Sequence, residues 1–214
     1  MDIVIAGAHG QIAMLLHPIL KKHGHNVKGL IRKPEQSGDL QKAGAVPVVA
    51  DIEKEDDISE AVGSADAVVF AAGAGPGSGK ERKWTVDRDG AIKLIDAAKK
   101  NGIKRYVMIS AMGLDTPRGD EVFQAYQKAK AEADEALRKS GLDYTIIKPG
   151  RLTNDPGTGR VKLARNLDGG EIPREDVARV IKAVIEDHRT IGKEFDLLSG
   201  ENSIESELLR LVEG

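Results

Sequence analysis

The stretch "IVIAGAHGQIAMLL", residues 3–16, joins three patterns that belong to different kinds of backbone. A β-branched apolar run is followed by Gly-Ala-His-Gly and then by apolar residues at helical spacing. Gly7, Gly10 and Ala13 stand at G-x-x-G-x-x-A spacing. Glycines at such a turn let the backbone approach a pyrophosphate, whose charge is favoured by the exposed N–H groups at a helix start. The stretch therefore predicts a phosphate-binding strand-turn-helix unit, and the alternative is a plain tight turn.

The rest of the chain continues this alternation of apolar runs and amphipathic stretches, which is typical of βαβ units. The strand runs are nearly all apolar, which suits strands covered by helices on both faces. We predict a single domain, residues 1–214, with an α/β Rossmann-type fold: a doubly wound parallel sheet with helices on both faces. The predicted strands are 2–7, 26–31, 46–50, 67–72, 105–110, 144–148 and 194–198, and the predicted helices are 11–22, 37–43, 56–62, 86–100, 121–139, 174–187 and 204–212.

Length and composition narrow the class of protein. The 214 residues, 40% hydrophobic and 31% charged, fit one soluble globular domain. A net charge of −2 gives no electrostatic case for nucleic acid or an anionic membrane, so we expect a small-molecule partner. There is no cysteine, and the chain enters "IVIAG" without a basic region or a long apolar run. We expect a cytoplasmic protein without a metal site, and we interpret His23 and His25 as the end of a helix.

The end of the second predicted strand bears on the choice of dinucleotide. An NAD site usually carries a carboxylate there for the ribose 2′-hydroxyl, whereas this strand ends in Arg32 and Lys33. Two cations suit a 2′-phosphate, so the sequence favours NADP(H) over NAD; the alternative is solvated surface charge. Asp51, at the end of the next strand, is expected near the adenine as an acceptor for its amino group. A helix N-cap is the competing role for Asp51.

Two Gly/Pro-rich segments, 71–83 and 149–161, each follow a predicted strand. They fall at the carboxyl edge, where open α/β sheets bind ligands, so we predict that both are loops of the site. Residues 150–173 are expected to form a small lid over the substrate. The alternative is that both segments are ordinary surface connections.

A second group of residues suggests acid/base chemistry. Tyr126 and Lys130 are four apart on a predicted helix, so their side chains project from one face. A phenol has a pKa near 10, and a nearby ammonium favours its ionised form. Ser110 ends the preceding strand, where its hydroxyl is placed to hold a substrate carbonyl. A Y-x-x-x-K pair alone occurs often by chance, but its combination with Ser110 and an upstream glycine motif is more specific.

Together these residues resemble the short-chain dehydrogenase/reductase superfamily, in particular its small atypical NAD(P)-binding members, the NmrA-like and epimerase/dehydratase-like group. The resemblance covers nearly the whole chain and includes "AAG" at 71–73, "IIKPGRL" at 146–152 and "IPREDVARVI" at 172–181. It implies that Ser110 orients the substrate, that Tyr126 donates a proton, and that Lys130 holds the nicotinamide ribose and lowers the tyrosine pKa. Asp87 lies in the region of the fourth helix where many members carry an asparagine. The expected cofactor-binding residues are Gly7, His9, Gly10, Gln11, Ile12, Arg32, Asp51, Ile52, Ala71, Ala72, Gly73, Tyr126, Lys130, Pro149, Gly150, Arg151 and Leu152.

These observations lead us to expect an NADP-dependent oxidoreductase that transfers a hydride to a small carbonyl-type substrate, with Tyr126 as proton donor. The alternative from another class is a non-catalytic dinucleotide-binding sensor or regulator. Retention of Tyr126 and Lys130 favours the enzyme, because binding alone does not require an acid/base pair. A nucleotide-sugar epimerase/dehydratase is third, since it needs a larger substrate lobe than the 64 residues after Gly150 provide.

Overall fold

The computed structural model describes residues 1–75 and 77–213. Pro76, within the predicted loop 71–83, and Gly214, at the end of the predicted domain, lie outside the described residues. The strands are β1 (Asp2–Ala6), β2 (Asn26–Ile31), β3 (Val46–Val49), β4 (Ala67–Phe70), β5 (Arg105–Ile109), β6 (Asp143–Pro149), β7 (Arg151–Thr153), β8 (Arg160–Ala164), β9 (Glu171–Pro173), β10 (Lys193–Ser199) and β11 (Asn202–Ser203).

The main sheet has nine strands in the order β11-β8-β10-β6-β5-β4-β1-β2-β3. The strands from β3 across to β10 are parallel, and β8 and β11 add an antiparallel end. The strand order reverses between β1 and β4, which creates the crevice where open α/β sheets bind ligands. The predicted Rossmann-type fold is confirmed.

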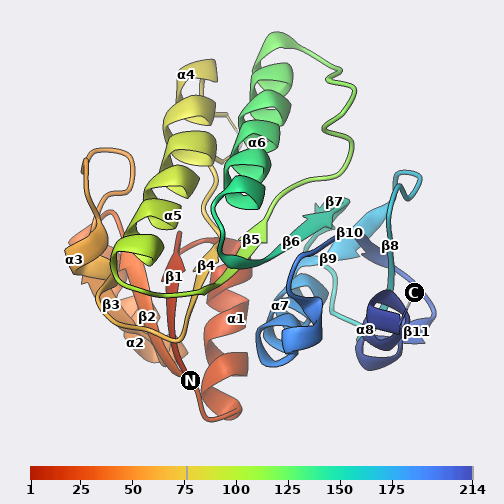
Figure 1. Ribbon diagram of the computed structural model, residues 1–214, viewed down its shortest axis with the longest axis horizontal. Coiled ribbons are helices and arrows are strands. Elements are labelled where there is room, and N and C mark those ends of the chain that lie inside the picture. Colours follow the sequence, from red (N-terminus) through yellow and green to blue (C-terminus); the bar gives the residue numbers. More distant parts are fainter. Residues whose placement is uncertain (76, 214) are drawn as a thin grey trace.

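Helices cover both faces of this sheet. They are α1 (Gln11–Lys22), α2 (Ser37–Ala43), α3 (Ser59–Val62), α4 (Lys80–Arg82), α5 (Gly90–Lys100), α6 (Glu121–Lys139), α7 (Arg174–Glu186) and α8 (Ile204–Glu213). In Figure 1, α5 lies beside α6 and α1 lies beside α7, in keeping with their contacts. Alternate residues of β1 enter the two cores: Ile3 and Ile5 pack with α1 and α7, and Val4 and Ala6 pack with α5. Burial of both faces explains why the strands read as continuous apolar runs.

Several segments differ from the prediction, among them α4 in the predicted loop 71–83 and the unpredicted strand β11. The helix expected at 56–62 begins at Ser59, because the Asp57 carboxylate accepts the Ser59 N–H at 2.8 Å and holds the preceding residues in a turn. The helix expected at 86–100 begins as a π-helix, Lys83–Asp89, before α5. The segment 150–173, expected to form a small lid, contains β7, β8 and β9, and β8 pairs with β10 in the main sheet. Residues 160–164 therefore belong to the main sheet, and the role of the segment as a lid over the substrate stays a prediction.

Across residues 1–75 and 77–213, no helix combines the length and the apolar character needed to cross a membrane.

Candidate functional site

A cleft of about 280 Å³ lies where the strand order reverses, at the carboxyl ends of β1, β2 and β4. The predicted cofactor residues that line it are Gly7, His9, Gly10, Arg32, Asp51, Ile52, Ala71, Ala72 and Gly73. Gln36, Glu53 and Arg82 line it too. Arg82 belongs to the predicted site loop 71–83, whereas no motif in the sequence singled out Gln36 or Glu53. The cleft thus brings together residues that the sequence assigned to one cofactor from separate segments.

The glycine turn at the floor of this cleft has the shape that a phosphate group requires. Gly7 has φ +79°, and a Cβ there would lie 2.5 Å from the Cα of Ala72, so no larger residue fits. A Cβ on Gly10 would lie 3.0 Å from the Gly7 carbonyl oxygen. No side chain caps the start of α1, and its first turn holds no acidic residue. The first N–H groups of α1 therefore remain available to an anion, which fits a pyrophosphate.

His17, which the sequence analysis missed, fastens α1 to the glycine turn. Its imidazole is fully buried, and its Nε2 lies 2.8 Å from the Ala8 carbonyl oxygen. Burial lowers the pKa of His17, so the ring is neutral at pH 7 and donates its Nε2–H to that carbonyl. A histidine within an amphipathic helix gives no sequence signal of this role, because the acceptor is a backbone atom of another segment.

Two arginines, Arg82 and Arg32, lie at the rim of the cleft and differ in their contacts. Arg82 donates from Nη2 to Glu53 Oε2 at 2.9 Å, and this bond is the main reason that the pKa of Glu53 is lowered. Arg32 is exposed and has no hydrogen-bond or ion-pair partner within the described part of the chain. Lys33, predicted beside it, does not line the cleft. Arg32 is therefore the strand-end cation positioned to meet an anion here.

The structure decides against one of the two predicted roles of Asp51. Its Oδ1 accepts the Glu53 N–H at 3.0 Å, which closes the turn after β3. This turn lies well before α3, so the helix N-cap interpretation is wrong. Asp51 does line the cleft, so its proximity to an adenine stays a prediction.

A buried polar cluster lies next to the cleft and consists of Asp87, Ser110, Lys130 and Asp134. Lys130 donates from Nζ to the Ile109 carbonyl at 3.1 Å, and its Nζ lies 3.6 Å from Asp87 Oδ1. The other oxygen of Asp87 accepts the N–H of Ala74, which lines the cleft, at 3.2 Å. Asp87 thereby joins the cleft to the predicted catalytic lysine. It belongs to the π-helix, an irregularity often found at functional sites.

Ser110 and Asp134 form the other half of the polar cluster. Ser110 follows β5, and its Oγ donates to Asp134 Oδ2 at 2.8 Å. Burial raises the pKa of Asp134 to about 6, although the hydrogen bond from Ser110 acts in the opposite direction. Asp134 was not predicted, because the many charged residues toward the end of α6 are typical of a solvent-exposed helix. Its position four residues after Lys130 was the available signal.

Tyr126 lies on the same helix as Lys130 but does not bond to it. Its half-buried ring stacks on Phe123, with centroids 5.9 Å apart, and Lys83 Nζ lies 5.7 Å from the ring centroid. Burial raises the pKa of Tyr126, and the carboxylates of Asp87 and Asp134 raise it further. The expected lowering by Lys130 is therefore wrong in this structure, because that ammonium is directed to Ile109 and Asp87. The phenol stays protonated at neutral pH, the state of a proton donor.

The remaining predicted site residues are placed as follows. Gln11 and Ile12 begin α1, and Ile12 enters the core. Pro149 ends β6, and Arg151 and Leu152 belong to β7; like Tyr126 and Lys130, they are not among the residues that line the 280 Å³ cleft. A Cβ on Gly150 would lie 2.5 Å from the Gly170 carbonyl, so this residue packs against the backbone before β9. Their contact with a nicotinamide stays a prediction.

Residues 157–159, the tip of the predicted lid, are hydrogen-bonded to the start of α7. The fully buried Asp176 carboxylate accepts the N–H groups of Thr158 at 2.9 Å and Gly159 at 2.8 Å. Glu175 accepts the Gly157 N–H at 2.9 Å. These charge-assisted bonds fix residues 157–159 to the start of α7.

The histidines near residue 24 have structural partners. His23 Nδ1 lies 2.8 Å from the Ile19 carbonyl, and His25 Nε2 lies 2.9 Å from Glu186. The described residues contain no group of three or more His, Cys, Asp or Glu side chains placed to hold a metal ion.

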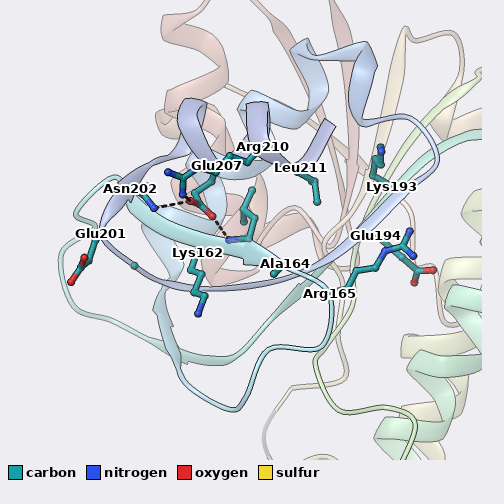
Figure 2. A pocket seen from close by; sticks show the side chains of 12 residues that line it. Lys162, Ala164, Arg165, Lys193, Glu194, Glu201, Asn202, Glu207, Arg210 and Leu211 are labelled. Carbon is teal, nitrogen blue, oxygen red and sulfur yellow. Dashed lines mark hydrogen bonds and ion pairs between the residues drawn. The ribbon is translucent and has the colours of Figure 1, made fainter. Parts of the chain in front are cut away.

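A larger cleft, about 870 Å³, lies between β8 and α8 and includes no predicted site residue. Its buried carboxylate, Glu207, accepts the Leu163 N–H at 2.9 Å and the Asn202 side-chain amide at 2.8 Å. Figure 2 shows Glu207 between Asn202 and the backbone of β8. Glu207 therefore joins α8 to the edge of the sheet.

Comparisons with known proteins agree with this geometry. A family described as NAD(P)H-binding matches residues 7–188. A Bacillus subtilis protein named as an uncharacterized sugar epimerase is 39% identical over 214 residues, covering 99% of this chain and 100% of the relative. An NAD-dependent epimerase/dehydratase-like protein of Bacillus halodurans has a TM-score of 0.93 at 40% identity, covering 99% of this chain and 100% of that one. The oxidoreductase YlbE of Lactococcus lactis has a TM-score of 0.87 at 28% identity, covering 100% and 98%. With its glycine turn, its reversal of strand order and a family match over most of its length, the chain belongs to the NAD(P)H-binding family of Rossmann-fold proteins.

Proposed function

We propose that this protein is an NADP(H)-dependent oxidoreductase that reduces a small carbonyl-type substrate. The main support for this proposal is the position of Asp87. Its carboxylate contacts both Ala74, at the dinucleotide cleft, and the buried Lys130. A protein that only binds a dinucleotide does not need a buried lysine-carboxylate pair and a protonated phenol beside the cleft. When bound, the nicotinamide would supply the hydride, and the protein would supply orientation and the proton.

Each group of residues has a role in this proposal. The Gly7 turn and the start of α1 would bind the pyrophosphate, and Arg32 would bind the 2′-phosphate. Lys130 would hold the nicotinamide ribose beside the 149–152 segment. Ser110 would hold the substrate oxygen, and Tyr126, protonated because burial raises its pKa, would donate a proton to that oxygen as charge develops on it.

The names of the relatives favour two reaction classes. The Lactococcus protein is named an oxidoreductase, whereas the two Bacillus proteins are named after epimerases or an epimerase/dehydratase. An epimerase returns its cofactor unchanged, while a reductase consumes one NADPH for each product molecule. The epimerase is therefore the second candidate, and the cofactor balance separates the two.

The test is a panel of small carbonyl compounds and sugar nucleotides, with NADPH followed by absorbance and the products by chromatography. We expect NADPH consumption with a carbonyl compound, and a fall of about 10² to 10⁴ in turnover for Tyr126→Phe with unchanged cofactor affinity. Tyr144→Phe, on β6, is the control and should retain wild-type turnover.

The other results each point to a different conclusion. Wild-type turnover by Tyr126→Phe removes the proton-donor role. Interconversion of sugar nucleotides without net NADPH loss establishes the epimerase. Tight NADPH binding without any turnover establishes the sensor.

A further inference from the structure

The hydrogen bond between Ser110 and Asp134 restricts what Ser110 can offer a ligand. Ser110 Oγ donates to Asp134 Oδ2 at 2.8 Å, and the two side chains are 3% and 1% exposed. A serine hydroxyl carries one hydrogen and two lone pairs. While Asp134 is ionised, that hydrogen is committed to the carboxylate. Ser110 can then accept a hydrogen bond from a ligand but cannot donate one.

Protonation of Asp134 would reverse this arrangement. A neutral carboxyl group can donate its O–H to Ser110 Oγ, which frees the serine hydrogen to turn toward the ligand. The other carboxyl oxygen, Oδ1, is buried and has no hydrogen-bond partner within residues 1–75 and 77–213. The carboxylate therefore lacks the several donors that normally stabilise a buried charge.

The charged groups that face Asp134 come from two elements. Lys130 and Arg138 lie on α6 with it, and Lys148 lies on β6. These cations favour the ionised form, but Lys148 donates to Glu194 at 2.7 Å and Arg138 lies 3.4 Å from the same carboxylate. The phenols of Tyr106 on β5 and Tyr126 on α6 also lie near Asp134, and its charge raises the pKa of both. Burial outweighs the cations, so both protonation states of Asp134 are accessible near neutral pH.

We propose that Asp134 is a positioning residue that sets, through Ser110, whether the site takes a carbonyl oxygen or an alcohol hydroxyl. This inference rests on the proposed reductase function. With Asp134 protonated, Ser110 donates to a carbonyl oxygen, and the site is arranged for reduction. With Asp134 ionised, Ser110 accepts from a hydroxyl, and the site is arranged to bind an alcohol. The proton that changes the arrangement comes from solvent and is not consumed in the reaction.

The first test needs no activity. In the cofactor-free protein, carbon-13 NMR of the carboxyl groups should show Asp134 titrating near pH 6. Ser110→Ala should raise the midpoint, because it removes a hydrogen bond that favours the ionised form. The exposed Asp96 on α5 is the internal control, and its midpoint should be the same in both proteins. A midpoint below pH 5, or a midpoint unchanged by Ser110→Ala, overturns the inference whatever the protein catalyses.

The second test uses benzaldehyde and benzyl alcohol as a matched pair of probes. For benzaldehyde reduction with NADPH, kcat/KM should fall about tenfold between pH 5 and pH 7, as the protonated fraction of a group titrating near pH 6 falls. The asparagine in Asp134→Asn does not titrate, so kcat/KM of this variant should change less than about twofold between pH 5 and pH 7. Asp96→Asn should keep the wild-type pH profile. A wild-type profile in Asp134→Asn overturns the inference. If Asp134→Asn does not fold, Ser110→Ala must lose the same pH dependence.

Failure of the reductase function is recognised separately. If Asp134 titrates as expected but no carbonyl compound is reduced, the reductase assignment is wrong. The preference of Ser110 for a carbonyl or a hydroxyl ligand is then measured as the binding of the two probes, by ligand-observed NMR. Benzaldehyde should be preferred at pH 5 and benzyl alcohol at pH 7.5, and the change should vanish in Asp134→Asn. A preference that does not change with pH, or no binding of either probe, overturns the inference.

Discussion

Asp87 Oδ1 lies 3.6 Å from Lys130 Nζ, and both side chains are almost fully buried. The pair joins two elements that are far apart in the sequence, the π-helix before α5 and the middle of α6. Its two charges are buried where water cannot stabilise either one alone. Lys130 therefore has a structural task in addition to the role proposed for it at the cofactor.

The first prediction concerns this pair. Lys130→Met should lower the free energy of unfolding by about 3 to 5 kcal/mol, because it leaves the Asp87 carboxylate buried without a counterion. Asp87→Asn should also destabilise, and the double variant should lose less than the sum of the two losses. Urea unfolding measures all three, with Lys128→Met, an exposed position on α6, as control. Additive losses would mean that the two side chains do not stabilise one another.

The second prediction concerns cofactor preference. Arg32 is exposed at the cleft without a partner in the described part of the chain, so a 2′-phosphate would gain a charge-assisted contact. Arg32→Glu should weaken NADPH binding by about 10- to 100-fold and leave NADH binding nearly unchanged, since such contacts contribute about 1.5 to 3 kcal/mol. Calorimetry measures both affinities. Lys33→Glu is the matched control, because Lys33 does not line the cleft. Equal wild-type affinities for NADPH and NADH would contradict the assignment of Arg32.

The third prediction concerns the segment expected to be a lid. The amides of Thr158 and Gly159 donate to Asp176, so they should exchange slowly even without cofactor. Asp176→Asn replaces a charged acceptor with a neutral amide and should speed exchange in this segment by about tenfold or more. Asp168→Asn, at an exposed position, is the control. Fast exchange of Thr158 and Gly159 in the wild type would show that the tip is not fastened to α7 in solution.

The fourth prediction is a pH dependence of stability. Burial lowers the pKa of His17 below its ordinary value of 6.5, so the unfolded chain binds a proton that the folded protein does not. This contribution to stability is present above pH 6.5 and is lost as the pH falls. His17→Gln keeps an N–H donor for the Ala8 carbonyl but does not titrate. Thermal unfolding from pH 7.5 to 5 should therefore show a smaller loss of stability in the variant, and parallel curves would exclude this role of His17.

The sequence predicted the elements whose signals are local. The helix predicted at 11–22 and the one at 37–43 match α1 and α2, because a glycine turn or turn residues mark where each begins and ends. Strand β8 was missed because "RVKLA" follows a Gly/Pro-rich segment, and it becomes a strand by pairing with the distant β10. Pairing partners at such separation leave no local trace in the chain.

The sequence also predicted many residues of the candidate site, but not their contacts. Motif spacing identified the cleft residues and placed Tyr126 and Lys130 on one helix face. Spacing could not show that Lys130 pairs with Asp87, because that choice depends on how the π-helix packs against α6. For the same reason it missed Asp134 and His17, whose burial and partners are set by other elements. Residue types and spacing identify candidates, and tertiary packing decides their charge and their partners.

The carboxylate of Glu207 has a further consequence for the edges of the sheet. An unpaired strand edge is a template on which another chain can add a strand, and this is a route to aggregation. At one end of the sheet, β11 pairs with only part of β8. The Leu163 N–H, which does not pair with β11, donates to the Glu207 carboxylate instead. At the other end, Pro47 removes an N–H from the middle of the short strand β3. Both ends of the nine-stranded sheet therefore resist the addition of a tenth strand.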